Sequence, residues 1–448
     1  GSHLVAVFHL YGKSMALDLE KEARERGIKY FLMSFVDLFG TLRAKLAPAS
    51  AIADMSEEGA GFAGFASWLD MTPAHPDMLA IPDPNSLIQI PWKPEVGWLA
   101  ADPYMDGKPV EQAPRNLLKR MLNKAEDAGY TMKMGVEPEY FLVSADGESL
   151  SDATDIQAKP CYDQSALMRR YDVVSEICDC MLELGWGPYQ NDHEDANGQF
   201  EMNWEFADAL TTADRMVFFK YMVKAIAEKH GIRATFMPKP FSHLTGNGCH
   251  MHVSLWDGDK NLFEDQNDDL GLSKVAYNFI GGLIDHADEI CSITNPTVNS
   301  YKRINAPVTS SGATWAPNTV TFAGNNRTHM VRVPGSGRFE LRLADGATNA
   351  YLFPAAVLAS GLDGIANNAD PGKPLDIDMY AEGHKAPADV KKLPLNLLDA
   401  LRLTDGSALL RREFGDEFVD AYVKLKTNNW NEYSHQLTGW ERANTLDC

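Results

Sequence analysis

Polar and apolar residues alternate along four segments of the chain, which is typical of β-strands with one face in a core. In the segment 246–255, His250, His252 and Ser254 alternate with Met251, Val253 and Leu255. The other three segments show the same alternation and place on their polar faces Glu137 and Glu139; Glu201, Asn203 and Glu205; and Arg338, Glu340 and Arg342. Four such segments predict an antiparallel sheet curved around a polar, metal-binding cleft.

The remaining patterns predict an α+β protein. A short charged helix at 20–25 and strands at 30–36, 42–46, 87–91 and 96–100 indicate a small β-rich N-terminal domain, with Gly- and Pro-rich loops at 60–64 and 73–84. Amphipathic or apolar helices are expected at 113–128, 165–184, 213–230, 272–290 and 414–426, with a loop at 185–191 and a buried strand at 234–240. We expect domains at 15–112 and 113–448, and we interpret residues 1–14 as an expression scar.

The net charge of −21 argues against nucleic acid or an anionic membrane as a partner. Against this background, the segment 303–342 carries five arginines, no lysine and a single acid, Glu340. Because guanidinium groups suit carboxylates and phosphates, a small anionic substrate is expected; the alternative is that these arginines lie on unrelated surfaces. Six cysteines without a Cys-x-x-Cys pair predict reduced thiols in a cytoplasmic protein, and no apolar run is long enough to span a membrane.

Candidate ligands are richer in carboxylates than in histidines, which favours Mg²⁺ or Mn²⁺ over zinc. The chain has no Gly-x-x-x-x-Gly-Lys-Ser/Thr loop, no Gly-x-Gly-x-x-Gly and no Gly-x-Ser-x-Gly. Glutamates, histidines and clustered arginines together indicate divalent metals that hold a polyphosphate while arginines stabilise a transferred phosphoryl group.

Seven motifs occur in the order and approximate spacing of the glutamine synthetase family, which the chain resembles from about residue 30 to its end. They are Glu137-Pro-Glu139-Tyr-Phe-Leu, His193-Glu194 with Gly198-Gln-Phe-Glu201, Ala234-Thr-Phe-Met-Pro-Lys-Pro, Gly248-Cys-His250-Met-His252-Val-Ser254, Asn299-Ser-Tyr-Lys-Arg303, Asn326-Arg327 and Arg338-Phe-Glu340-Leu-Arg342. The resemblance implies an N-terminal β-grasp domain and a catalytic domain with two divalent metals, Mg²⁺ or Mn²⁺, in the cleft of its sheet.

The resemblance also implies roles for individual residues. Glu139, Glu194 and Glu201 are expected to bind one metal, and Glu137, His250 and Glu340 the other. Glutamate would be held by Arg303, Arg342 and the backbone of Gly246, and ATP by Arg327, Arg332, Arg338, Phe219, His252 and Ser254. Asp37 from a neighbouring subunit would deprotonate the amine, with Arg327 and Arg342 as further catalytic residues and Tyr162, Glu194 and Trp315 lining the amine pocket.

The chain departs from the family pattern where the amine is expected to bind. Glutamine-forming relatives carry Glu-Ala-Pro in the flap after the Arg303 motif, whereas this chain has Trp315-Ala-Pro, and the stretch before it is about six residues longer. An indole removes a charge and adds an apolar wall that attracts cations, at roughly 0.5–2 kcal/mol per contact, which favours a small alkylammonium. The alternative is a shifted alignment in which Trp315 packs in a subunit interface.

A second departure is Thr245, which stands where the family has an Asn beside the glutamate site. Residues 385–405 contain no tyrosine, so the nucleotidylation control of some bacterial relatives is not expected.

We therefore expect an ATP-dependent ligase that joins glutamate to methylamine through a γ-glutamyl phosphate, in a homo-oligomer that the family implies is a dodecamer. Glutamine synthesis from ammonium is the first alternative, and a ligase for ethanolamine or a polyamine is the next. A non-enzymatic relative and a metallohydrolase are rivals of other classes; glutamate-dependent ATP turnover would separate the ligase from both.

Overall fold

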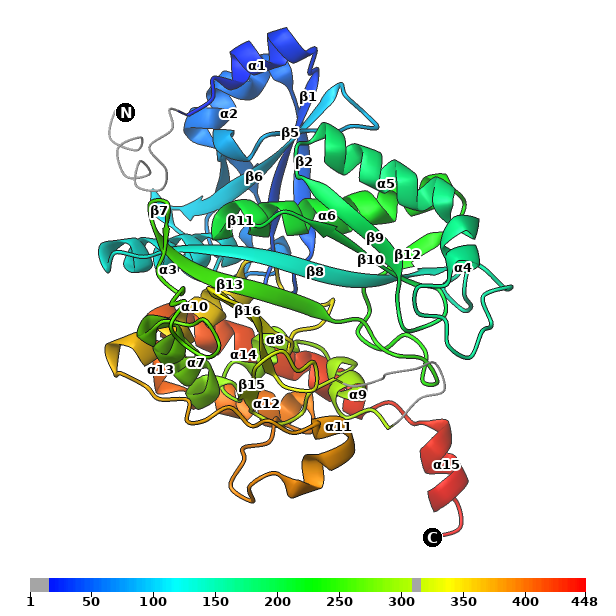
Figure 1. The fold of residues 1–448 in the computed structure, drawn as a ribbon. Helices are drawn as coiled ribbons and strands as arrows, with labels where there is room; N and C mark the ends of the chain where they lie inside the picture. The colour runs from blue at the N-terminus through cyan, green and yellow to red at the C-terminus, as the bar shows by residue number, and fades with distance from the viewer. Residues whose placement is uncertain (1–15, 308–315) are drawn as a thin grey trace.

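The computed structural model describes residues 16–307 and 316–448, and Figure 1 shows two sheets surrounded by helices. The mixed α+β class predicted from the sequence is confirmed. Residues 1–14, expected to be an expression scar, and Trp315 lie outside the described residues.

The N-terminal part forms a seven-stranded sheet in the order β2-β1-β6-β4-β3, with β5 and β7 also paired to β6. Strand β1 runs antiparallel to β2 and parallel to β6. Its elements are α1 (Leu19–Arg26), β1 (Tyr30–Val36), β2 (Leu42–Pro48), α2 (Ile52–Glu58), β3 (Ala60–Phe62), β4 (Met78–Pro82), β5 (Ile88–Gln89), β6 (Val96–Met105) and β7 (Lys108–Pro109). The segments 60–64 and 73–84, predicted as loops, therefore contain β3 and β4.

The larger part is built on a ten-stranded sheet in the order β15-β16-β17-β13-β8-β10-β9, with β11 and β12 paired to β8 and β14 paired to β13. Figure 1 shows β8 and β13 crossing the middle of the molecule. The strands are β8 (Thr131–Val143), β9 (Pro188–His193), β10 (Gln199–Trp204), β11 (Ala207–Asp208), β12 (Arg233–Thr235), β13 (Cys249–Asp257), β14 (Lys260–Asn261), β15 (Phe322–Ala323), β16 (Val331–Gly335) and β17 (Arg338–Leu341).

Helices cover this sheet, and the last six of them follow its final strand β17 in the chain. They are α3 (Pro114–Asp127), α4 (Gln164–Arg169), α5 (Tyr171–Glu183), α6 (Ala209–Lys229), α7 (Lys274–His286), α8 (Cys291–Thr294), α9 (Ser300–Ile304), α10 (Leu352–Ala366), α11 (Met379–Glu382), α12 (Leu397–Asp405), α13 (Ala408–Phe414), α14 (Asp416–Ser434) and α15 (Gly439–Thr445). Within residues 16–307 and 316–448, no helix combines the length and apolar character needed to cross a membrane.

Helix α6 lies between the two sheets, which explains why apolar residues occur all around it. On one side Phe218 packs against Trp98 of β6, with ring centroids 5.7 Å apart. On the other side Phe219 packs against Trp204 of β10 at 4.8 Å. One hydrophobic cluster therefore joins both sheets, and the division at residue 112 stays a prediction.

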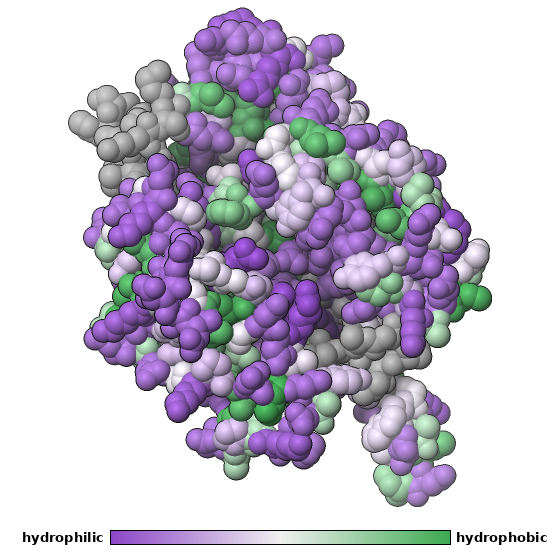
Figure 2. Space-filling view, viewed as in Figure 1, coloured by the Kyte–Doolittle hydropathy of each residue, from purple (hydrophilic) through white to green (hydrophobic). Residues whose placement is uncertain are grey.

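Polar side chains dominate the face of the molecule drawn in Figure 2, and the apolar patches on it are small and scattered. This surface agrees with the net charge of −21.

Candidate active site

The four segments with polar faces become neighbours in the sheet, in the order β17-β13-β8-β10. The antiparallel register places His250 opposite Glu137 and His252 opposite Glu340. It also places Glu201 opposite Glu139. Residues directly opposite each other in a sheet project from the same face, so the polar side chains gather on one side. The alternating residues Met251, Val253 and Leu255 are at most 1% exposed, as a core-facing set should be.

Glu139, Glu194 and Glu201 form what we name the tri-glutamate cluster, in which one carboxylate oxygen from each lies within 4.8 Å of the others. Burial and the neighbouring negative charges raise the pKa of Glu194. The same two causes raise the pKa of Glu201. Burial also raises the pKa of Glu139 to about 7, against the opposing effect of Arg303. Three carboxylates this close together fit a divalent cation. The positive charge of the ion would offset the repulsion among the three carboxylates, which the neighbouring residues do not offset.

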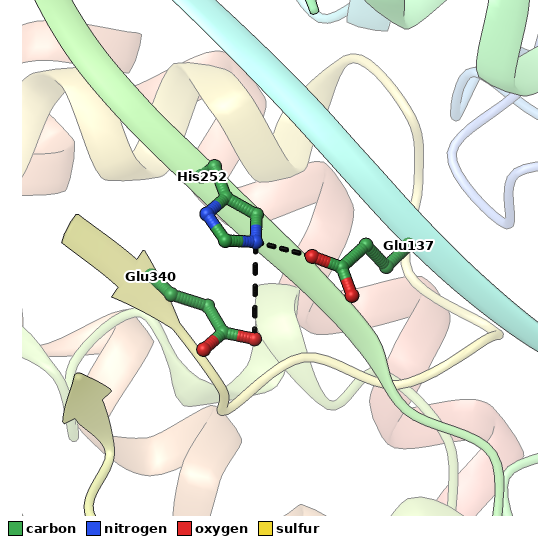
Figure 3. Close-up of side chains that lie close together, drawn as sticks. All are labelled: Glu137, His252 and Glu340. Carbon is green, nitrogen blue, oxygen red and sulfur yellow. Dashed lines mark hydrogen bonds and ion pairs between the residues drawn. The ribbon is translucent and has the colours of Figure 1, made fainter. Parts of the chain in front are cut away.

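Glu137, His252 and Glu340 form a second cluster, whose ligand atoms also lie within 4.8 Å of one another. Figure 3 shows the His252 ring of β13 facing Glu137 on one side and Glu340 on the other. Its Nε2 contacts Glu137 and lies 4.0 Å from Oε1 of Glu340. An imidazole with two carboxylates again fits a divalent metal.

The predicted roles of the two histidines stay predictions, because both rings lie beside the carboxylate of Glu340. The sequence assigned His250 to this metal and His252 to the nucleoside, yet His252 is the histidine within the second cluster. His250 lies next to it, with Nδ1 3.3 Å from Oε1 of Glu340. Both rings project from the same face of β13, and the alternation of residues along a strand does not determine which ring leans toward a given carboxylate.

Two arginines bind Glu340. Arg332 donates to its Oε2 at 2.8 Å, and Arg342 donates to its Oε1 at 2.9 Å. Burial opposes ionisation, but the contacts with His250 and Arg342 outweigh it and lower the pKa of Glu340. The Nε of Arg342 is buried and has no hydrogen-bond partner among residues 16–307 and 316–448. A buried donor of this kind is normally paired, so it is a candidate contact for a bound anion.

Arg303, expected at the glutamate, is buried at 6% exposure and donates to the carbonyl of Leu343 at 3.2 Å. Its side chain also approaches two glycines. A Cβ on Gly248 would lie 2.9 Å from Nη2 of Arg303 and 2.7 Å from Oε1 of Glu139. A Cβ on Gly246 would lie 2.3 Å from the carbonyl of Pro238. Both positions therefore need glycine for the backbone to pass this close to the site.

The predicted amine-pocket residues are only partly brought together. Tyr162 is 76% exposed, and its pKa is raised by Cys161, by burial and by Glu194, which places it near the tri-glutamate cluster. Asp37 is fully buried in the N-terminal part, where it accepts from Nε of Arg43 at 3.0 Å. Its action in a neighbouring subunit stays a prediction.

A cavity of about 290 Å³ adjoins the second cluster and contains His252, Ser254 and Arg338, all predicted to bind ATP. Phe219 does not line it: the prediction for this residue is wrong, because Phe219 is fully buried between α6 and the sheet. Exposed aromatic side chains there are Phe206, at 55% exposure, and Tyr189, at 65%. Phe206 lies two residues beyond the end of strand β10 at Trp204.

Sequence patterns missed several cavity residues, among them Lys133, Tyr189, Phe206 and Trp256. Lys133 could have been found, because it lies on the same face of β8 as Glu137, four residues away. Of the other predicted ATP contacts, Arg332 is bound to Glu340 and Arg327 is exposed.

Comparison with known proteins adds to this geometry. Residues 111–445 match the family described as glutamine synthetase, catalytic domain. The chain belongs to the glutamine synthetase family. It is 63% identical over 435 residues to a glutamine synthetase of Rhizobium leguminosarum bv. phaseoli, covering 97% of this chain and 100% of the relative. It is 42% identical to a glutamate–methylamine ligase of Methyloversatilis universalis, covering 95% and 97% of the two chains.

A solved structure of a GmaS–ADP complex is 63% identical to the chain and superposes with a TM-score of 0.93, covering 96% of this chain and 100% of that one. These relationships establish an ATP-dependent ligase that forms carbon–nitrogen bonds. The family implies ATP and divalent metal ions, and the two carboxylate clusters suit such ions.

Proposed function

We propose that this ligase joins the γ-carboxylate of glutamate to methylamine at the expense of ATP, giving γ-glutamylmethylamide, ADP and phosphate. The observation that carries the choice of amine is the absence of any acidic residue between Arg303 and Glu340, with Trp315 where glutamine-forming relatives have Glu. A relative named glutamate–methylamine ligase and solved structures of GmaS support the same amine.

The two clusters would hold divalent metals, which when bound neutralise phosphate oxygens and so help the terminal phosphoryl group to leave ADP. The chain's own cations support the same transfer. Arg342, whose Nε has no partner within the described part of the chain, and Arg332, at 2.8 Å from Glu340, present guanidinium donors to the transferred group. Arg303 holds the substrate glutamate, assisted by the Gly246 backbone, whose carbonyl accepts from Gln199 at 2.9 Å.

In the first step a γ-carboxylate oxygen attacks the terminal phosphorus, and the bond to ADP breaks. In the second step the amine nitrogen attacks the acyl carbon, phosphate leaves with the bonding electron pair, and the amine proton passes to Asp37 of a neighbouring subunit. Activation is necessary because a free carboxylate resists nucleophiles, whereas phosphate is a good leaving group. The amine pocket would be the one that the family resemblance implies, with Trp315, Tyr162 and Glu194, and an indole there would give the methyl group an apolar contact worth roughly 0.8 kcal/mol.

Glutamine synthesis is the second candidate, and a specific observation favours it. Two relatives named glutamine synthetase are 63% and 62% identical to the chain over 435 residues. Such relatives imply that ammonium also enters the site, so the two candidates differ in relative kcat/KM and not in the chemistry of activation.

The test is phosphate release at fixed glutamate and ATP with methylamine, ammonium and ethanolamine as separate nucleophiles. Methylamine should give the highest kcat/KM, and equal or better turnover with ammonium would reject the proposed amine. Glutamate labelled with ¹⁸O in its γ-carboxylate should transfer one label to the released phosphate. Unlabelled phosphate would reject the acyl phosphate while leaving the choice of amine open.

The proposal includes a cytoplasmic homo-oligomer, a dodecamer as the family implies. Phe65 and Trp68, at 55% and 48% exposure, lie in the same N-terminal region as Asp37, and Trp68 contacts Phe39 of the Asp37 loop. Exposed aromatic side chains at this place suit a subunit interface, and all six cysteines are free thiols, as in a reducing compartment. Light scattering of the purified protein tests the assembly, and a monomer that is active at low concentration would contradict it.

A further inference from the structure

Arg327 lies in the loop 324–330, which connects the neighbouring strands β15 and β16. Its charge opposes the rise in the pKa of Tyr162 that Cys161 and burial produce, so the guanidinium lies within electrostatic range of Tyr162. A loop backbone and a long side chain can adopt many conformations. A guanidinium that must meet a transferred group therefore needs a fixed backbone beneath it.

The loop residues on both sides of this arginine are bonded to a distant part of the chain. The carbonyl oxygen of Ile377 accepts two hydrogen bonds from the loop, one from Nδ2 of Asn326 and one from Nε2 of His329, both at 2.9 Å. The segment around Ile377 is itself attached to β15, where the backbone N–H of Leu375 donates to the carbonyl of Phe322 at 3.0 Å. One carbonyl group thus holds both sides of the loop against the sheet.

The two residues that remain beside Arg327 are held as well. The hydroxyl of Thr328 accepts from the backbone N–H of Met379 at 2.9 Å. On the other side, Oδ1 of Asn325 accepts from Nε and Nη2 of Arg332 at 2.9 and 2.7 Å. The loop backbone under Arg327 therefore has bonds on each side to parts of the chain outside the loop.

His329 is the fully buried member of this set, at 0% exposure. A carbonyl oxygen can only accept, so Nε2 carries the proton that Ile377 binds. Burial lowers the pKa of His329 and keeps the ring neutral. Its Nδ1 therefore accepts from the hydroxyl of Thr321 at 2.8 Å. One neutral ring joins the loop to the residue just before β15 and to the Ile377 segment.

We propose that His329 is a positioning residue which, with Asn326, holds the loop of Arg327 on the Ile377 carbonyl and so directs the guanidinium to the transferred phosphoryl group. This rests on the proposed ligation and on the catalytic role that the family resemblance implies for Arg327. His329 is buried beneath the loop, so it acts through the arginine and not on the substrate.

The experiment measures kcat, KM for ATP and KM for glutamate in the intact enzyme with Mg²⁺. His329→Leu, which removes both hydrogen bonds but fills most of the same space, should lower kcat by about 10- to 100-fold, since a shift of about 1 Å in a catalytic group can cost about 100-fold. KM for glutamate should change little. His329→Gln, whose amide can still donate to the Ile377 carbonyl, should recover most of the rate. Asn326→Ala, at a half-buried position, removes the second donor and should resemble His329→Leu.

A double-mutant cycle separates positioning from a general structural role. Arg327→Ala alone should lower kcat at least as far as His329→Leu. Adding His329→Leu to it should have little further effect, because the guanidinium through which His329 acts is gone. Asn326→Ala in the same cycle gives the answer if His329→Leu does not fold. His286→Gln is the matched control, since His286 also uses both ring nitrogens, remote from the site, and its loss should leave kcat unchanged.

Two results would overturn the inference while leaving the ligase in place. One is a normal kcat in both His329→Leu and Asn326→Ala when Arg327→Ala lowers it. The other is an equal loss from His329→Leu with and without Arg327, together with a higher KM for glutamate, because that pattern indicates a general structural role. If Arg327→Ala keeps a normal kcat, the inference fails with the role of Arg327, whereas glutamate-dependent ATP turnover would still support the proposed function.

Discussion

The backbone N–H of Gly248 donates to Oε1 of Glu139 at 2.7 Å. The residue immediately before β13 thereby orients one carboxylate of the tri-glutamate cluster. A Cβ at position 248 would lie 2.7 Å from that same oxygen and 2.9 Å from both Nη2 of Arg303 and Nε2 of His250. One backbone position therefore contacts groups expected to bind metal and glutamate, which makes it a sensitive probe of the site.

Gly248→Ala should lower kcat/KM by about 10- to 100-fold and weaken Mn²⁺ binding, because the added methyl displaces groups that orient metal ligands. Steady-state kinetics and metal titration of the purified variant measure both effects. Gly406→Ala is the control, since its Cβ would make only an ordinary contact, 3.6 Å from the carbonyl of Arg402. An active Gly248→Ala enzyme with normal metal affinity would show that Glu139 is not a ligand.

Divalent metal should stabilise the protein through the tri-glutamate cluster. At a concentration 100 times its Kd, a bound ion contributes about 2.7 kcal/mol to folding. Glu194→Gln should abolish most of this gain, and it should also raise the melting temperature of the metal-free protein, because a neutral amide replaces an acid whose ionisation the buried cluster opposes. Thermal melts with chelator and with Mg²⁺ measure both. A lower metal-free melting temperature for Glu194→Gln would contradict the idea of uncompensated repulsion.

The sequence predicted best those helices and strands that have one face in the hydrophobic core and the other face in a polar environment. The strand Tyr30–Val36 has the predicted bounds, and the faces of β13 divide as expected. Less regular elements were missed for identifiable reasons. Strand β9 has the polar sequence Pro188–His193, because as an edge strand it needs only backbone pairing with β10. The helix expected at 165–184 is interrupted at Arg170, where the backbone leaves helical geometry and the guanidinium binds Ser151.

The strands that form the candidate site could be predicted from the sequence. The orientation of individual side chains on those strands could not. Alternation places Glu137, His252 and Glu340 on one face, and the sheet brings them together. It does not distinguish His250 from His252, which differ only in how the rings lean. Alternation also gives no information on Phe206, which lies two residues beyond the end of the strand at Trp204, and Phe219, which the resemblance implied for ATP, belongs to the core.

His286 should make stability depend on pH at a place remote from the site. Its Nδ1 lies 2.7 Å from Glu289 and its Nε2 2.7 Å from Asp363. Burial opposes the charged form of the imidazole, but the hydrogen bonds and negative charges of Glu289 and Asp363 outweigh this effect and raise the pKa of His286. The stabilisation is complete below the unfolded-state pKa and is lost as the pH rises through the folded-state pKa. His286→Gln should therefore destabilise by about 1 kcal/mol at about pH 6 and by less at about pH 9, as measured by urea unfolding.

Exposed His384 is the control, because His384→Gln should have no such pH-dependent effect on unfolding. A loss in His286→Gln that is the same at both pH values would mean that the ring stabilises only by packing.

Arg115 should be essential for the junction between the two sheets. Its guanidinium, 3% exposed, binds Asp83 at 2.8 Å and both Asp102 and Asp214 at 2.9 Å. Arg115→Met leaves three carboxylates without their shared cation and should destabilise by about 3–5 kcal/mol. Thermal or denaturant unfolding measures this, with exposed Arg24→Met as a control near zero. A loss below about 1 kcal/mol would show that water or Lys119 compensates.

The choice of amine is the central claim, and direct competition tests it best. The enzyme is given glutamate, ATP, Mg²⁺ and equal concentrations of methylamine and ammonium, and the products are counted by mass spectrometry. γ-Glutamylmethylamide should predominate, and Trp315→Glu should shift the product ratio toward glutamine. Predominant glutamine from the unaltered enzyme would contradict the proposal.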